Sequence, residues 1–71
     1  MKYFVIYETT ATGFSAYVPD LPGCIATGKT MDETKKRIRE AIDFHLAGLR
    51  EDGLPLPPAA TVAAEEVAIP A

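Results

Sequence analysis

The chain has 71 residues, of which 48% are hydrophobic and 24% are charged, and its formal net charge at pH 7 is −3. This length and composition predict one small globular domain over residues 1–71 and exclude a disordered chain. The acidic balance argues against a nucleic-acid-binding surface, which needs clustered Lys and Arg. No stretch has the length and hydrophobicity of a membrane span or the pattern of a signal peptide, so we expect a cytoplasmic protein.

Small size also predicts self-association. Ordering a residue costs about 1.5 kcal/mol and burial returns about 25 cal/mol per Å², so the balance for so short a chain is close to zero. Small domains gain further stability from disulfides, metals or oligomerisation. Cys24 is the single cysteine, so an internal disulfide is excluded, and no cluster of metal-ligand spacing is present. We therefore expect a homo-oligomer, either a dimer or a tetramer.

The strongest strand pattern covers residues 2–8, a β-branched and aromatic run followed by turn-forming residues. In a strand, alternate side chains point to opposite faces. Both faces of this strand would therefore carry aromatic and β-branched side chains. Such a strand is either buried on both sides, or buried on one side and used for contact on the other.

A second strand is expected over residues 14–18, joined to the first by a hairpin. Phe14, Ala16 and Val18 would share one face of this strand, and Tyr17 would lie on the other. Together with a third strand after the next turn, these segments predict a three-stranded antiparallel meander.

The turn between the second and third strands is predicted at residues 21–23. Pro22 presets φ for the first corner of a tight turn, and Gly23 supplies the positive φ of the second. Asp20 is expected to support this turn through an Asx hydrogen bond. The third strand then follows over residues 24–27.

A helix is predicted over residues 31–51. Thr30 and Glu33 have the spacing of a capping box, in which the Thr hydroxyl accepts from the Glu amide and the Glu carboxylate reaches back. Gly53 is a suitable residue for the C′ position beyond the helix end. The apolar positions of this segment fall on one broad stripe, so the helix should cover one face of the sheet.

We expect the helix to cover the face that carries Phe4 and Ile6. The opposite, open face would then be available to another chain, because its aromatic side chains can present both apolar surface and a polar tip. The residues predicted for this oligomer or partner interface are Tyr3, Val5, Tyr7 and Tyr17.

Prolines within residues 54–58 end the helix and enforce an extended path. Residues 61–69 are expected to form a fourth, edge strand, although their alanines and glutamates suit a helix better. The alternative for residues 59–71 is a tail. Either way, the segment is long enough only to complete a sheet edge or to reach a neighbouring subunit. The predicted fold class is α+β, with the order βββαβ.

No catalytic, metal or cofactor site is predicted. Glu8 and Asp20 could approach each other across the meander, which leaves a residual metal-dependent nuclease open as an alternative. His45 lies on the apolar stripe of the helix and is interpreted as a core or interface imidazole. Cys24 is interpreted as a small buried hydrophobe. The glycines do not have the spacing of a phosphate-binding loop.

Three runs carry a family resemblance: Phe-Ser-Ala-Tyr-Val-Pro-Asp-Leu-Pro-Gly-Cys, then Thr-Met-Asp-Glu at the helix start, then Gly-Leu-Pro-Leu-Pro-Pro. Together they resemble the HicB-like antitoxin family over roughly residues 1–58. The resemblance implies a βββα fold with a terminal strand, a truncated RNase H-like arrangement without nuclease activity. It also implies dimers or higher oligomers, and a partner that is a small basic ribonuclease toxin of the HicA type.

Many members of that family carry a second, C-terminal DNA-binding domain. Residues 59–71 are too few to form one, so we expect no direct DNA binding. The leading hypothesis is an antitoxin-like protein that neutralises a HicA-type ribonuclease by occluding it. The first alternative is a homo-oligomeric interaction domain without a toxin, and the second is the residual nuclease.

Overall fold

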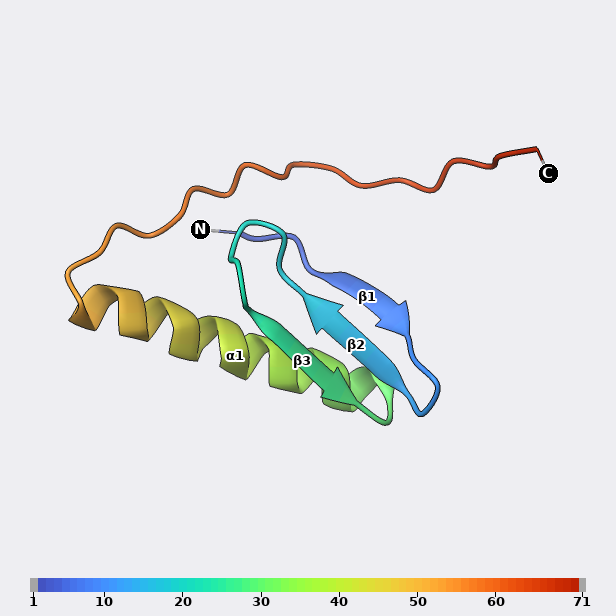
Figure 1. Ribbon diagram of the computed structural model, residues 1–71, viewed down its shortest axis with the longest axis horizontal. Helices are drawn as coiled ribbons and strands as arrows, with labels where there is room; N and C mark the ends of the chain where they lie inside the picture. Colours follow the sequence, from blue (N-terminus) through green and yellow to red (C-terminus); the bar gives the residue numbers. More distant parts are fainter. Residues whose placement is uncertain (1, 71) are drawn as a thin grey trace.

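Three short strands precede one long helix and an extended tail in the computed structural model, which describes residues 2–70 (Figure 1). The elements are β1 (Ile6–Thr9), β2 (Phe14–Tyr17), β3 (Ile25–Gly28) and α1 (Met31–Glu51). The strands form an antiparallel sheet in the order β1-β2-β3. The α+β class with a three-stranded meander and one helix is therefore confirmed. Met1 and Ala71, the ends of the predicted domain, lie outside the described residues.

The β1–β2 hairpin sets the register of the sheet. The amide of Thr10 donates to the carbonyl of Gly13 at 2.9 Å, which places Thr9 opposite Phe14. The prediction that the first strand begins at residue 2 is wrong. The ladder starts at Ile6, because β2 ends at Tyr17 and the chain then turns away.

The turn after β2 has the predicted geometry. The amide of Cys24 donates to the carbonyl of Leu21 at 3.0 Å, and Gly23 has a φ of 82°. Pro22 at the first corner and a positive φ at the second are the features of a type II turn. This turn places Leu21, which is 0% exposed, in the core. The loop is thus part of the packed structure and not a simple connection.

The helix begins at its predicted cap. The Thr30 hydroxyl accepts from the amide of Glu33 at 3.1 Å, as expected for an N-cap. The other half of the predicted capping box is replaced, because the Glu33 carboxylate pairs with Arg37 at 2.7 Å. Arg37 also donates to the carbonyl of Thr27 at 3.0 Å and so ties the first turns of α1 to β3.

The helix ends as predicted too. Gly53 has a φ of 68°, and its amide donates to the carbonyl of Arg50 at 3.1 Å. The amide of Leu54 donates to the carbonyl of Leu49 at 2.9 Å. These two bonds form a Schellman motif, which satisfies carbonyls that the end of a helix leaves free.

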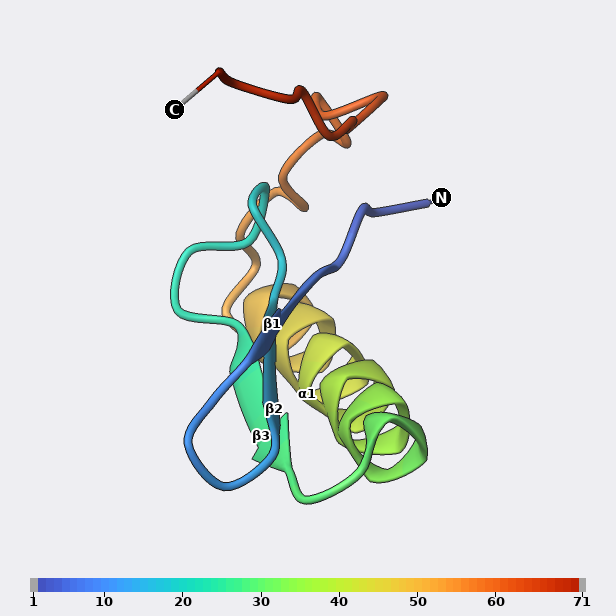
Figure 2. The same ribbon diagram turned by 90° about the vertical axis from the view of Figure 1, so that its right-hand side faces the viewer.

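The core lies between α1 and one side of the sheet, where the helix packs against β3 and β2 (Figure 2). Its buried hydrophobic residues are Ala16, Val18, Leu21, Cys24 and Ile38. Partly buried side chains from the first segment of the chain pack against this cluster on the same side, namely Tyr3, Val5 and Tyr7.

The predicted choice of sheet face is therefore wrong. The helix covers the side of Tyr3, Val5 and Tyr7, and the side of Phe4 and Ile6 is open. Hydrophobicity could not decide this point, since both faces of this segment are apolar. The other strands decide it, because alanines of β2 and β3 on the covered side allow α1 to lie close to the sheet.

The predicted fourth strand is not formed within the described residues, and residues 54–70 make an extended tail instead. Two contacts hold its first half. The Tyr3 hydroxyl donates to the carbonyl of Pro57, and both carboxylate oxygens of Asp20 accept from Thr61, one from the amide and one from the hydroxyl, each at 3.0 Å. The Asp20 carboxylate therefore anchors the tail, where an Asx bond within its own turn had been expected.

We predict that Thr30→Ala destabilises the protein by about 0.5–2 kcal/mol, because the first turn of α1 loses its capping oxygen. Urea unfolding followed by circular dichroism measures the change. Thr12→Ala, in the exposed hairpin loop, is the matched control and should stay within about 0.5 kcal/mol of the wild type. Equal midpoints for Thr30→Ala and the control would contradict this account of the helix start.

Cys24 should be a poor nucleophile in the folded chain. The residue is 4% exposed, and burial raises the pKa of its thiol above the usual value. A raised pKa lowers the thiolate fraction at any given pH, and the thiolate is the reactive form. Reaction with Ellman's reagent at pH 8 should be much slower in the native state than in guanidinium chloride.

A cysteine at an exposed position gives the control for that measurement. Thr12→Cys in a Cys24→Ser background should react rapidly without denaturant, because residue 12 is exposed. Rapid labelling of native Cys24 at the same rate as this control would contradict its placement in the core.

Candidate partner-binding surface

The side of the sheet opposite α1 carries no covering element within residues 2–70, and we call it the open face (Figure 2). The cross-strand register brings three apolar side chains into one line across it. Ile6 lies opposite Tyr17, and Tyr17 lies opposite Ile25. Because each residue comes from a different strand, this apolar row crosses the whole width of the sheet.

Much of the apolar row is accessible to solvent. Ile25 is 63% exposed and Tyr17 is 39% exposed, while Ile6 is half-buried. Phe4, which is 38% exposed, lies two positions before Ile6 and lines a groove that Ala59 and Val62 of the tail also border. Contiguous exposed apolar surface on a small protein is typical of an interaction site.

The next row of the same face is polar. Glu8 lies opposite Ser15, and Ser15 lies opposite Thr27. Glu8 and Thr27 are exposed. The open face therefore has an apolar half near the Leu-Pro-Gly turn and a polar half near the hairpin loop, which resembles the division of an interface into an apolar centre and a polar rim.

A groove continues the apolar half toward the turn after β2. Its lining combines strand residues with proline and glycine of that turn and comprises Tyr17, Val18, Pro19, Pro22, Gly23 and Ile25, together with the buried Leu21 and Cys24. Because Leu21 and Cys24 are core residues, the groove wall is held by the same packing that fixes the fold.

The structure divides the four residues that the sequence analysis assigned to the interface. Tyr17 lies on the open face as expected, whereas Tyr3, Val5 and Tyr7 pack against the core on the helix side. An interface role for any of them stays a prediction.

The open-face residues that sequence reasoning missed are Phe4, Ile6 and Ile25. The signal that could have found them is the hairpin length. A four-residue loop over residues 10–13 places Ile6, and not Tyr7, opposite Tyr17.

The outer face of α1 has a different character. Charged side chains of both signs alternate along it, and they line a second groove formed by Asp32, Lys35, Lys36, Arg39, Glu40 and Asp43. Mixed charge of this kind is typical of a solvated helix surface. Phe44, which is 83% exposed, is the large apolar side chain in this region.

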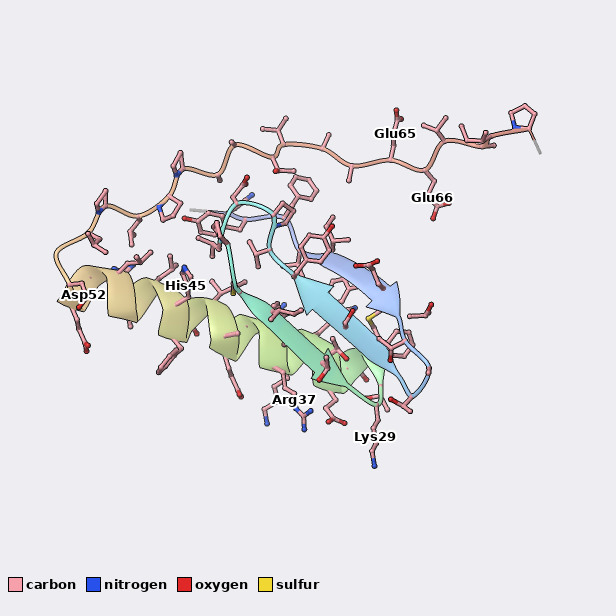
Figure 3. The ribbon with its side chains drawn as sticks, in the orientation of Figure 1. Lys29, Arg37, His45, Asp52, Glu65 and Glu66 are labelled. Atoms are coloured by element: carbon pink, nitrogen blue, oxygen red, sulfur yellow. The ribbon has the colours of Figure 1, made fainter. Side chains whose placement is uncertain are left out.

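The residues considered for catalysis are separated by the fold. Glu8 pairs with Ser15 inside the sheet, while Asp20 lies beyond the end of β2 and holds Thr61. His45 is half-buried on the side of α1 that faces the tail (Figure 3). Over residues 2–70, His, Cys, Asp and Glu form no group of three or more that could hold a metal ion.

In the same range no helix has the length and hydrophobicity needed to cross a bilayer.

Known structures contain a close match to this arrangement. One chain of a solved HicA3 and HicB3 toxin–antitoxin complex superimposes with a TM-score of 0.68 and is 36% identical, over 78% of this chain and 64% of that chain. A 14.9 kDa protein from the rep-hol intergenic region of Haemophilus phage HP1 is 40% identical over 57 residues, which are 80% of this chain and 43% of the phage protein. The chain thus spans less than half the length of that relative.

A shorter relative is matched over most of its length. A UPF0150 protein of Helicobacter pylori is 39% identical over 49 residues, which are 69% of this chain and 68% of that protein. The sequence model of the HicB-like antitoxins of bacterial toxin–antitoxin systems matches residues 3–70. The match includes the strands, the helix and the tail, and the chain therefore belongs to the HicB-like antitoxin family.

Proposed function

We propose that the protein is an antitoxin that neutralises a small basic ribonuclease of the HicA type by occluding it, and that it catalyses no reaction itself. The observation that carries this proposal is the similarity to a chain of the HicA3 and HicB3 complex, at 36% identity and a TM-score of 0.68. The match of the HicB-like antitoxin family model to residues 3–70 supports the same role.

We assign the toxin contact to the open face. The apolar row formed by Ile6, Tyr17 and Ile25 supplies exposed apolar area that no helix or strand within residues 2–70 covers. Exposed aromatic side chains such as Tyr17 are frequent in the centres of protein interfaces. The groove beside the row adds a concave surface into which a partner side chain could fit.

The net charge of −3 supports the same partner. A basic protein approaches an acidic one faster than a neutral one does, and opposite charges around an apolar centre favour the correct orientation. Charge thus accounts for the rate and specificity of the encounter. Burial of the apolar row accounts for the stability of the complex.

We predict that Ile25→Glu weakens binding to a co-expressed HicA-type toxin by at least about tenfold, since it places a charge in the centre of the interface. Isothermal titration calorimetry with a catalytically inactive toxin measures the affinity. Growth rescue of cells that express the active toxin reports neutralisation.

Thr27→Glu is the matched control, because residue 27 lies on the same strand and the same face but belongs to the polar row. It introduces the same charge at an exposed position and should change the affinity by less than about threefold. If both variants bind as tightly as the wild type, the open face is not the contact. If the wild type binds no HicA-type toxin, the antitoxin proposal fails.

A second candidate function is a homo-oligomeric interaction domain without a toxin. The exposed apolar side chains of the open face favour it equally well, because a second copy could cover them. Sedimentation equilibrium of Ile25→Glu distinguishes the two. A wild type that binds no HicA-type toxin, together with loss of a homo-oligomer in Ile25→Glu, would favour this second function over the first.

A further inference from the structure

β3 is an outer strand of the sheet, and its outer edge carries backbone groups that β2 does not pair. The hydrogen-bond phase of the ladder identifies these groups. The amide of Val18 donates to the carbonyl of Cys24 at 3.2 Å, so Cys24 and every second residue after it turn their backbone groups toward β2. The backbone groups of Ile25 and Thr27 consequently point to the outer edge.

The residues that form this edge do not protect it themselves. A row of unpaired backbone groups is a template for another strand, and proteins commonly protect such an edge with charged residues or proline. Residues 24–28 read Cys-Ile-Ala-Thr-Gly and contain neither. Ile25, which is 63% exposed, adds a β-branched side chain of the kind that favours strand pairing. Any protection of this edge therefore comes from outside β3.

The side chain of Arg37, on α1, occupies the edge. Its Nη1 donates to the outward-facing carbonyl of Thr27 at 3.0 Å, and its Nη2 pairs with the carboxylate of Glu33 at 2.7 Å. Because the guanidinium is planar and its donors have a fixed geometry, two acceptors held at once fix its orientation. Figure 3 shows Arg37 where α1 passes the end of β3.

The short connection between β3 and α1 sets the position of Arg37. Two residues separate Gly28 from Met31, so the first turns of the helix lie beside the end of the strand. Glu33 lies one turn before Arg37 on the same side of α1, and its amide is bound by the Thr30 hydroxyl at the helix cap. The cap, the carboxylate and the guanidinium thus form one series of contacts that ends on the strand edge.

We propose that Arg37 closes the outer edge of β3 against the addition of another strand. A chain that paired with β3 would need the carbonyl of Thr27, which already accepts from Arg37. It would also separate the guanidinium from its partners or leave a charge beside the new hydrogen bonds, and both are unfavourable. Since β3 has only four residues, one occupied carbonyl removes much of the edge that a new strand could use.

A closed β3 edge leaves the open face accessible. Ile25 belongs both to the apolar row and to the outer strand, so the row ends at the edge that Arg37 closes. A partner can contact Ile25 across the face, whereas a strand cannot add beside it. The sheet thereby exposes apolar surface without open-ended pairing at β3. This role of Arg37 does not depend on a toxin.

The variant Arg37→Met tests the proposal on the full chain without a toxin, because methionine keeps an apolar, unbranched side chain but has neither the charge nor the donors. Arg39→Met is the matched control, since it removes the same charge from an exposed position on the outer face of α1. In sedimentation equilibrium, Arg37→Met should associate beyond the wild-type mass at concentrations at least about tenfold lower than Arg39→Met does. Circular dichroism checks that both variants fold.

Amide hydrogen exchange locates the association. In the wild type, the amides of Ile25 and Thr27 should exchange rapidly at every protein concentration, because they face outward. In Arg37→Met, their exchange should slow by at least about tenfold as the concentration rises, since a second chain then pairs with them. Arg37→Met that keeps the wild-type mass, Arg39→Met that associates equally well, or association that leaves both amides unprotected would each overturn the proposal.

Discussion

One helix covers one side of a three-stranded sheet, and this constraint determines where the rest of the apolar surface lies. α1 packs on β3 and β2 over the small side chains Ala16 and Ala26. The bulkier Tyr17 and Ile25 consequently point to the other side, where the chain has no second layer among the residues described. A sheet of this kind needs another molecule if both of its faces are to be dry.

The parts that hold this arrangement also shape the surfaces it leaves free. The type II turn buries Leu21 in the core, and the same turn forms the groove next to Ile25. Asp20, beside that turn, holds Thr61 and so sets the point at which residues 62–70 leave the body of the molecule. The open face and the path of the tail therefore both depend on one packed unit, although they lie on different parts of the molecule.

The helix could be predicted from sequence because its boundaries are local. The Thr30 cap and the positive φ of Gly53 depend on a few neighbouring residues, and both are present. The covered face could not be predicted from residues 2–8 alone, since both faces of that segment carry apolar side chains. That choice depends on the hairpin register, which places Ile6 opposite Tyr17.

The length of β1 and the fate of the tail depend on contacts between distant residues. Residues 2–5 have strand-forming side chains, yet β2 turns away before it can pair with them. The tail is held by Tyr3 and Asp20, which lie 54 and 41 positions from their partners. Local sequence preference carries no information about either contact, so an edge strand was predicted where the described chain has an extended tail.

The central claim is that the open face is the partner-binding surface, and isoleucine methyl NMR tests it most directly. Ile6 and Ile25 lie on the open face, whereas Ile38 and Ile42 belong to α1. On titration with an inactive HicA-type toxin, the account predicts intermolecular Overhauser contacts to the methyl groups of Ile6 and Ile25. Toxin contacts confined to the outer face of α1, with unchanged Ile6 and Ile25 signals, would contradict it.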